Sequence, residues 1–203
     1  PELGHFLLII AAMTALLAPA VVFYGIRRGD DFYAGFSRPA SLLTALMLTL
    51  STAALVWAFL IDDFSVAYVA NHSNTKLAPA YKAAALWGSH EGSMLLWIWL
   101  MAVGTAGAGF VRCADRLFTA RLQGLMLAVL AGFCAFLLFT SNPFLRNLPM
   151  VPPDGRDLNP ILQDIGMIPH PPVLFMGYAG LALMFAAMCA LLLSGRWSKT
   201  AID

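Results

Sequence analysis

Five long windows without a charged residue constrain this chain more than any other feature of its sequence. No Asp, Glu, Lys or Arg occurs in residues 3–26, 39–61, 92–111, 122–145 or 165–195. Each window supplies the roughly 20 apolar residues that are needed to cross about 30 Å of hydrocarbon. Because lipid offers no partner to backbone N–H and C=O groups, apolar segments of this length are expected to be helices.

The sequence therefore predicts an all-α, polytopic membrane protein with five transmembrane helices in a single domain, residues 1–203. The helices are expected at about 3–26, 39–61, 92–111, 122–141 and 172–195, with two long loops at 62–91 and 142–171. Only 11% of the residues are charged, against about 25% in soluble domains, so a soluble fold is excluded. The net charge of +1 gives no reason to expect a nucleic-acid partner.

Lys and Arg are unequally divided between the two ends of the predicted helices. Eight belong to the short connections and the C-terminal segment, and four belong to the two long loops. The eight are Arg27, Arg28, Arg38, Arg112, Arg116, Arg121, Arg196 and Lys199. Because cytoplasmic loops carry the excess of positive charge, the N-terminus and both long loops are expected on the outer side of the membrane, which is the periplasmic side if the source is a Gram-negative bacterium.

The composition of the long loops favours order. Six prolines stiffen residues 142–170, and Leu145, Leu148, Leu158, Ile161 and Leu162 offer apolar side chains that could pack. In the other loop, residues 79–87 are expected to form a short amphipathic helix. The three cysteines, at positions 113, 134 and 189, include no pair in the outer loops and are expected to be inert.

His170 is the first candidate functional residue, and it stands directly before two prolines in "HPPVLFMGYAG". A residue before proline is disfavoured in the α region, so His170 is expected to be extended where the fifth helix starts. The positive end of the helix dipole then favours a neutral imidazole, which is a common metal ligand. With Phe175 and Tyr178 nearby, this pattern suits axial ligation of a flat haem. An interfacial histidine bonded to loop backbone is the alternative.

His90, in "WGSHEGSMLLWIWL", is the second candidate, again at the outer end of a predicted helix. Glu91 could act as the carboxylate that orients a ligating imidazole, and Trp87 could contact an apolar cofactor. The tryptophans could instead be ordinary anchors at the membrane interface. In the proline-rich loop, Arg146 and Arg156 could hold haem propionates, or could pair with Asp154, Asp157 and Asp164.

Three stretches closely resemble the CcmF family of cytochrome c-type biogenesis proteins, with the NrfE branch as a near alternative. They are "PELGHF" at the start, "YKAAALWGSHEGSMLLW" at 81–97 and "NPFLRNLPMVPPDGRDLNPILQDIGMIPHPPVLFMGYAG" at 142–180. The resemblance implies a component of the cytochrome c haem lyase, which handles a transiently bound b-type haem. It also implies that His170 matches a periplasmic haem-ligand histidine of the family, so His170 is the expected metal ligand.

The same resemblance implies partners. Family members receive haem from the chaperone CcmE, and CcmH and CcmI deliver apocytochrome c for thioether formation. They are about three times as long as this chain, which is therefore expected to be an N-terminal part that works with a further C-terminal segment. A membrane scaffold that docks CcmE or CcmH, while other segments bind haem, is the alternative function.

Overall fold

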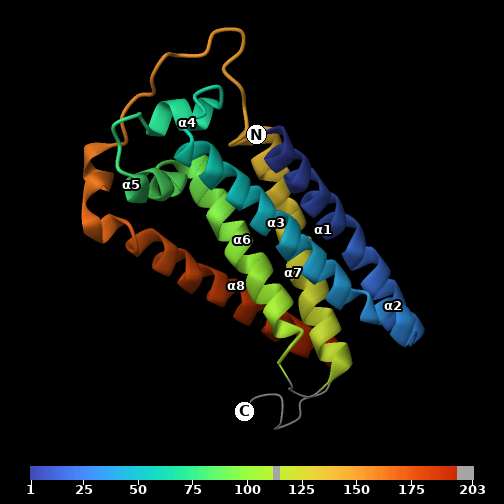
Figure 1. Cartoon of the computed structure of the whole chain (residues 1–203). Coiled ribbons are helices and arrows are strands. Elements are labelled where there is room, and N and C mark those ends of the chain that lie inside the picture. The colour runs from blue at the N-terminus through green and yellow to red at the C-terminus, as the bar shows by residue number, and fades with distance from the viewer. Residues whose placement is uncertain (112–114, 196–203) are drawn as a thin grey trace.

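The computed structural model describes residues 1–111 and 115–195, and this part of the chain is helical, with no β-strand. The elements are α1 (Glu2–Arg28), α2 (Asp31–Gly35), α3 (Ser37–Leu60), α4 (Ala67–His72), α5 (Pro79–Ala84), η1 (Ala85–Trp87), α6 (His90–Ala108), α7 (Arg116–Thr140), η2 (Pro160–Gln163), η3 (Ile165–Met167) and α8 (His170–Ser194). Figure 1 shows a bundle of long helices with the short elements gathered over one end. The predicted all-α class is confirmed.

Four helical segments among the described residues are long and apolar enough to cross a membrane: Glu2–Arg28, Asp31–Leu60, Arg116–Thr140 and Ile165–Ser194. The 19-residue helix α6 is not among them. Its first turn carries His90 and Glu91, which lowers its mean hydropathy. Whether α6 is a fifth membrane span therefore stays a prediction. The helix runs within the bundle beside the other long helices (Figure 1).

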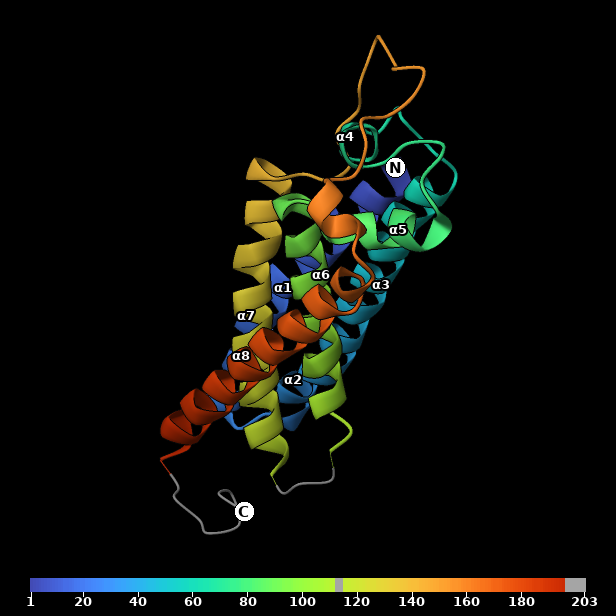
Figure 2. The same cartoon turned by 90° about the vertical axis from the view of Figure 1, so that its left-hand side faces the viewer.

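The core lies where α1, α3, α6 and α7 meet, and α8 covers α6 and α7 from outside (Figure 2). Leu8, Leu48, Leu55 and Met126 are fully buried there. Small residues let the helices approach closely, as expected for packing in a membrane. One interhelical hydrogen bond runs from the Ser51 hydroxyl to a carbonyl oxygen of α1, at 2.8 Å.

Residues 62–89 and 141–169 together form a cap over the end of the bundle from which α6 and α8 start (Figure 1). The two segments are joined by backbone hydrogen bonds, of which Arg156 N–H to the Ala70 carbonyl, at 2.7 Å, is the shortest. The predicted helix near 79–87 is confirmed as α5 followed by η1. Both long loops are thus ordered parts of one structure.

The predicted apolar contacts within residues 142–171 are only partly correct. Leu158 is 1% exposed and packs under the cap, whereas Leu145 (59%), Leu148 (71%) and Ile161 (74%) point outward. Leu162 is half-buried against the core. Because backbone hydrogen bonds to the neighbouring loop hold this segment, few of its side chains need to be buried.

The starts of α7 and α8 differ from expectation for reasons that the structure shows. Helix α7 begins at Arg116 instead of residue 122, because the Asp115 carboxylate accepts a hydrogen bond from the Leu117 N–H at 3.0 Å and caps the helix. Helix α8 begins at His170 itself, so the predicted extended conformation of His170 is wrong. Pro169 already has αR geometry, and its carbonyl accepts from the Val173 N–H at 3.2 Å.

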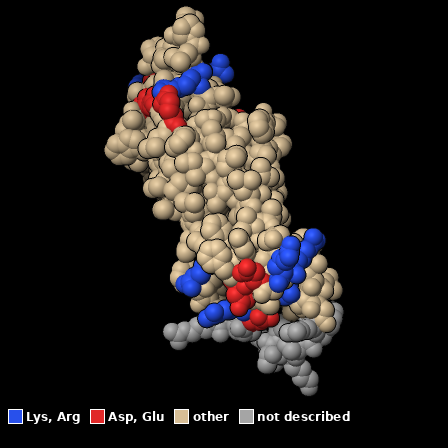
Figure 3. Space-filling model, turned by 90° about the vertical axis from the view of Figure 1, so that its right-hand side faces the viewer, with Lys and Arg blue, Asp and Glu red and all other residues tan. Residues whose placement is uncertain are grey.

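Charged side chains gather at the two ends of the molecule and leave an uncharged belt between them, as Figure 3 shows for one face. This distribution fits a multi-pass membrane protein. The orientation across the membrane stays a prediction. Of the residues that carried it, Arg112, Arg196 and Lys199 lie outside the described residues, as does Cys113.

Candidate functional site

The first turns of α8 carry an open groove of about 560 Å³. It is lined by His170, Val173, Leu174, Gly177, Tyr178 and Leu181. Their spacing of three or four residues places all six on one face of the helix. The groove therefore has an apolar wall with an exposed imidazole at its outer end and a phenol in its middle.

Tyr178 also belongs to a cluster of aromatic rings between α6, α7 and α8. The ring centroid of Trp97 lies 6.4 Å from that of Phe175 and 6.2 Å from that of Tyr178, and it lies 4.9 Å from that of Phe133. The Phe175 and Tyr178 rings meet edge to face, with centroids 6.2 Å apart. Phe175 thus backs the groove without lining it, and it holds Tyr178 in place.

Trp87 connects the cap to the start of α8. Its indole N–H donates to the Met167 carbonyl at 3.3 Å, which joins η1 to η3 just before His170. The Asp164 carboxylate caps η3 by accepting from the Gly166 N–H at 2.7 Å. Trp87 therefore does not line the groove, but it helps to fix the segment from which His170 projects.

His90 is the first residue of α6, and its side chain is 67% exposed. Its Nδ1 lies 3.4 Å from a Glu91 carboxylate oxygen and 3.3 Å from the Ser89 hydroxyl. The predicted pairing of His90 with Glu91 is thus present. His90 does not line the groove under His170, although both helices start beneath the same cap (Figure 1).

Tyr68 anchors the segment that carries Trp87 and His90. Its buried hydroxyl donates to the Leu86 carbonyl at 2.9 Å and accepts from the Ser89 N–H at 3.1 Å. Burial raises the pKa of this phenol well above its ordinary range. It therefore stays protonated and keeps donating over the physiological pH range.

The two candidate arginines differ in what they contact. Arg146 makes an ion pair and hydrogen bonds with Glu2, bonds the Ser65 hydroxyl and lies 3.9 Å from Asp63. Arg156 is exposed, and its side chain forms no ion pair within residues 1–111 and 115–195. The expected pairing of these arginines with aspartates of the proline-rich loop is therefore wrong for the described residues.

Those aspartates bond to backbone N–H groups instead. Asp154 accepts from the Thr75 N–H at 3.0 Å and from the Gly155 N–H at 2.8 Å, and these bonds lower the pKa of its carboxyl group. Asp157 accepts from the Leu158 N–H at 2.8 Å. They shape the cap, and among the described residues Arg156 forms no ion pair with them.

Comparison with known proteins identifies the family. A model of the cytochrome c assembly protein family matches residues 87–201, which is more than half of the chain. The chain belongs to the cytochrome c assembly protein family. The matched region contains the groove, the aromatic cluster and both candidate histidines.

Individual relatives carry the names that the resemblance implied. The chain is 47% identical over 197 residues to the cytochrome c-type biogenesis protein CcmF of Pseudomonas aeruginosa, covering 97% of this chain and 30% of that protein. It is 44% identical over 187 residues to NrfE of Haemophilus influenzae, covering 92% of this chain and 29% of that protein. The chain thus spans less than a third of the length of these relatives.

A solved structure, titled cytochrome c haem lyase CcmF, has a similar fold. It superposes with a TM-score of 0.81 over 98% of this chain and 31% of that chain, at 23% identity. The membership predicted from the three sequence stretches is confirmed. The similarity to both CcmF and NrfE leaves the branch open.

In this member of the family, no three His, Cys, Asp or Glu side chains come together as a metal site within residues 1–111 and 115–195. Among the described residues that line the groove, His170 is the one side chain of these four types. Haem iron needs no more than one or two protein ligands, because the porphyrin supplies the other four. The groove, with one exposed imidazole over an apolar wall, fits that group.

The sequence interpretation missed Trp97, which was assigned to the interface with the other tryptophans. Its indole N–H is buried and finds no hydrogen-bond partner among the described residues. Trp97 lies two turns into α6, about 10 Å below the helix start at 1.5 Å per residue. That depth is the signal that could have separated it from tryptophans at the level of the head groups.

Proposed function

We propose that this chain forms a haem-facing part of a cytochrome c haem lyase, which receives haem from CcmE and supports its attachment to apocytochrome c. The observation that carries the proposal is the exposed imidazole of His170 at the mouth of an apolar groove. The family membership and the names of the relatives support it. The chain spans only part of those relatives, so the activity belongs to the longer assembly.

In this proposal haem, in its b-type form, is the substrate. His170 would hold the iron through its imidazole, and Val173, Leu174 and Leu181 would contact the macrocycle. A Cβ atom added at Gly177 would meet no atom within 4 Å, so the helix surface is open at that point. Tyr178, held by Phe175, gives the pocket one rigid aromatic wall.

The chemistry that follows is orientation rather than acid–base catalysis. Each thioether forms when a cysteine S–H adds across a haem vinyl group, with sulfur bonded to one carbon and the proton taken up by the other. Holding both vinyl groups near two thiols makes the reaction effectively intramolecular. Of the two arginines, Arg156 is the better placed to bind a propionate, because Arg146 is already engaged by Glu2 and Ser65.

The proposed setting is the bacterial inner membrane, with the N-terminus and the cap on the periplasmic side. There the cap meets CcmE and the CcmH/CcmI pair, and further segments of the family architecture complete the haem site. His90, paired with Glu91, would lie at the same surface as a second imidazole.

A scaffold function is the second candidate, and one observation favours it. The cap exposes large apolar side chains away from the helix bundle: Leu145, Leu148, Met150, Ile161 and Ile165 are 59–85% exposed. Exposed apolar patches mark sites of contact with proteins or with the membrane, and this candidate function assigns the patch to a protein. In that case the cap would dock CcmE or CcmH, and haem would bind elsewhere.

Haem capture by the purified chain distinguishes the two functions. Haem-loaded CcmE is mixed with wild type, His170→Ala and His5→Gln, and transfer is followed by the absorption spectrum. We expect His170→Ala to lose at least tenfold in captured haem. His5→Gln is the matched control, because this histidine bonds Asn142 at the same end and lies outside the groove.

A filled groove gives an independent test that keeps the imidazole. Gly177→Leu places a side chain where haem would lie, and it should reduce capture as strongly as His170→Ala does. Equal capture by wild type and both variants would refute the haem site. Loss of CcmE binding in Met150→Ser/Ile161→Ser, with capture from free haem unchanged, would favour docking by the cap.

A further inference from the structure

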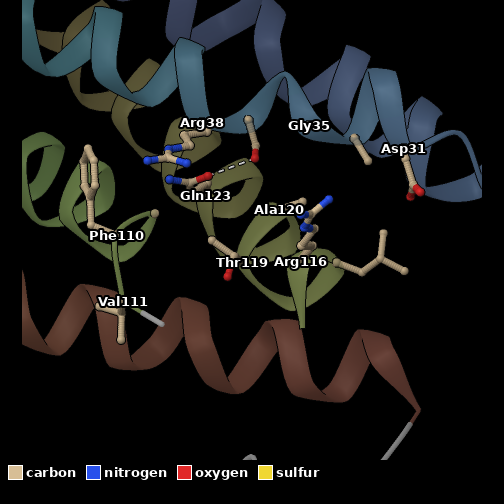
Figure 4. Close-up of a pocket in the computed structure, with 13 residues that line it drawn as sticks. Asp31, Gly35, Arg38, Phe110, Val111, Arg116, Thr119, Ala120 and Gln123 are labelled. Carbon is tan, nitrogen blue, oxygen red and sulfur yellow. Dashed lines mark hydrogen bonds between the residues drawn. The ribbon is translucent and has the colours of Figure 1, made fainter. Parts of the chain in front are cut away.

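A second cavity, of about 680 Å³, lies at the end of the bundle away from the cap. It is bordered by the junction of α2 and α3, the C-terminal end of α6 and the first turns of α7 (Figure 4). Its size is in the range of small-molecule sites, which is roughly 300–1,000 Å³. None of the haem-related candidates lines it.

The floor of this cavity is a buried polar network. Ser37 donates from its hydroxyl to the Gln123 side-chain oxygen at 2.8 Å, and the Gln123 amide donates to the Thr105 carbonyl at 3.1 Å. All three residues are buried. A Cβ atom at Gly109 would come within 2.8 Å of the Gln123 amide nitrogen, so a larger residue there would displace the Gln123 side chain. The polar floor is therefore fixed by three different helices.

Two arginines project at the cavity without a carboxylate partner. Arg38 and Arg116 both line it and are exposed, and neither forms an ion pair in the part of the chain that the structure describes. Figure 4 shows the Arg38 guanidinium beside Gln123, with Arg116 on the opposite side. Among the described residues of the lining, Asp31 is the single acidic one, and the Asp115 carboxylate already caps α7.

Apolar side chains adjoin these charges. The Arg38 guanidinium carbon lies 4.7 Å from the ring centroid of Phe110, which is 60% exposed, and Val111 is 58% exposed. Leu117 continues the apolar lining. The site therefore combines positive charge with apolar surface, at the end of helices that are long enough to cross a bilayer.

We propose that this cavity binds the phosphate group of an anionic phospholipid. Guanidinium groups bind phosphate oxygens in bidentate fashion, and Arg38 and Arg116 approach from two sides. A free phosphate would use the arginines alone, whereas a phospholipid also covers Phe110, Val111 and Leu117 with its glycerol and upper acyl carbons. The position at a membrane interface favours the lipid, because basic groups there attract anionic head groups. The inference does not depend on the haem proposal.

Lipid retention measured by native mass spectrometry tests it. The chain is purified in a neutral detergent and titrated with dioleoyl phosphatidylglycerol or dioleoyl phosphatidylcholine. We expect a preference for phosphatidylglycerol that weakens about fivefold in Arg38→Gln or Arg116→Gln and about 25-fold in the double variant. Arg27→Gln is the matched control, because it removes the same charge at the same end outside the cavity.

A further variant and a check of folding separate loss of the site from loss of structure. Val111→Glu retains both arginines but adds a carboxylate to the lining, and it should weaken phosphatidylglycerol binding to a similar extent. Circular dichroism of each variant reports whether the helices are intact. Equal retention of both lipids, or an equal effect of Arg27→Gln, would overturn the proposal. Inorganic phosphate that binds with the affinity of the lipid would also overturn it in favour of a free-anion site.

Discussion

The hydroxyl of Tyr68 links the backbone on both sides of Trp87, in the segment that leads to His90. The substitution Tyr68→Phe tests how much these hydrogen bonds stabilise that segment. The substitution keeps the ring, which packs edge to face on Phe59 with centroids 5.6 Å apart. It removes only the oxygen that donates to the Leu86 carbonyl and accepts from the Ser89 N–H. No cavity larger than one oxygen atom is created.

The magnitude follows from the burial of these groups. Tyr68 is 4% exposed, so two backbone groups would be left without partners away from water. An unsatisfied buried donor or acceptor costs about 1–3 kcal/mol, and some relaxation toward water is expected at this end of the molecule. We therefore expect a loss of about 2 kcal/mol in the free energy of local opening, which corresponds to about a 30-fold change in its equilibrium constant.

Amide hydrogen exchange over residues 85–92 measures this opening directly. Tyr81→Phe is the matched control, because Tyr81 is half-buried in the same loop and no hydrogen bond from its hydroxyl is found among the described residues. Exchange should accelerate about 30-fold in Tyr68→Phe and less than threefold in Tyr81→Phe. Equal acceleration in the two variants would refute the anchoring role of the Tyr68 hydroxyl.

Two further predictions concern charged groups of the cap. Lys82→Met should lower the free energy of unfolding by about 3 kcal/mol, because the Lys82 side chain is 9% exposed, lies 2.6 Å from an Asp62 oxygen and would leave that carboxylate without its ion pair. Unfolding by a chaotrope measures the loss, and most of it should be recovered in Lys82→Met/Asp62→Asn. No recovery in the double variant would contradict the pairing. Asp154→Asn should speed proteolysis near Thr75 at pH 7. Because the pKa of Asp154 is lowered, its stabilisation exists above the ordinary aspartate pKa and is lost as pH falls through the lowered value, so both proteins should converge in acid. A difference that persists below about pH 2 would contradict this origin.

The helices could be predicted from the sequence because their cause is local. A window without charge must be helical in lipid wherever it packs, and the windows correspond to α1, α3, α6, α7 and α8. The helix starts were harder, because they depend on single capping groups such as the Asp115 carboxylate. Only structure reveals whether the capping bond forms.

The partners of charged groups could not be predicted, because they are distant in the sequence. Arg146 pairs with Glu2 across 144 positions, and Lys82 pairs with Asp62 rather than remaining solvated. Composition indicated correctly that the loop contains arginines and carboxylates. It could not indicate that the loop crosses the N-terminal end of α1. That crossing gives Arg146 an ion pair with Glu2, whereas Arg156 has no ion pair among the described residues.

The two histidines could not be separated by sequence either, because each is an imidazole at the start of an apolar helix. Their surroundings differ through the neighbouring helices. Under His90, α6 is enclosed by α3, α7 and α8, and Leu95 and Ile98 are fully buried. Under His170, the described buried residues of α8 are three alanines, and 17% of its apolar window is buried, against 39–50% for the other candidate spans.

This difference in burial makes His170 a stronger candidate for haem binding than His90. A flat ligand on His170 finds an open wall along α8, whereas a ligand on His90 would meet a helix whose faces are already covered. Burial of apolar surface adds affinity for a macrocycle to that of the imidazole–iron bond, and only His170 has such a surface below it among the described residues. Substituting His90 should therefore change haem capture far less than filling the groove at Gly177, which leaves both imidazoles in place.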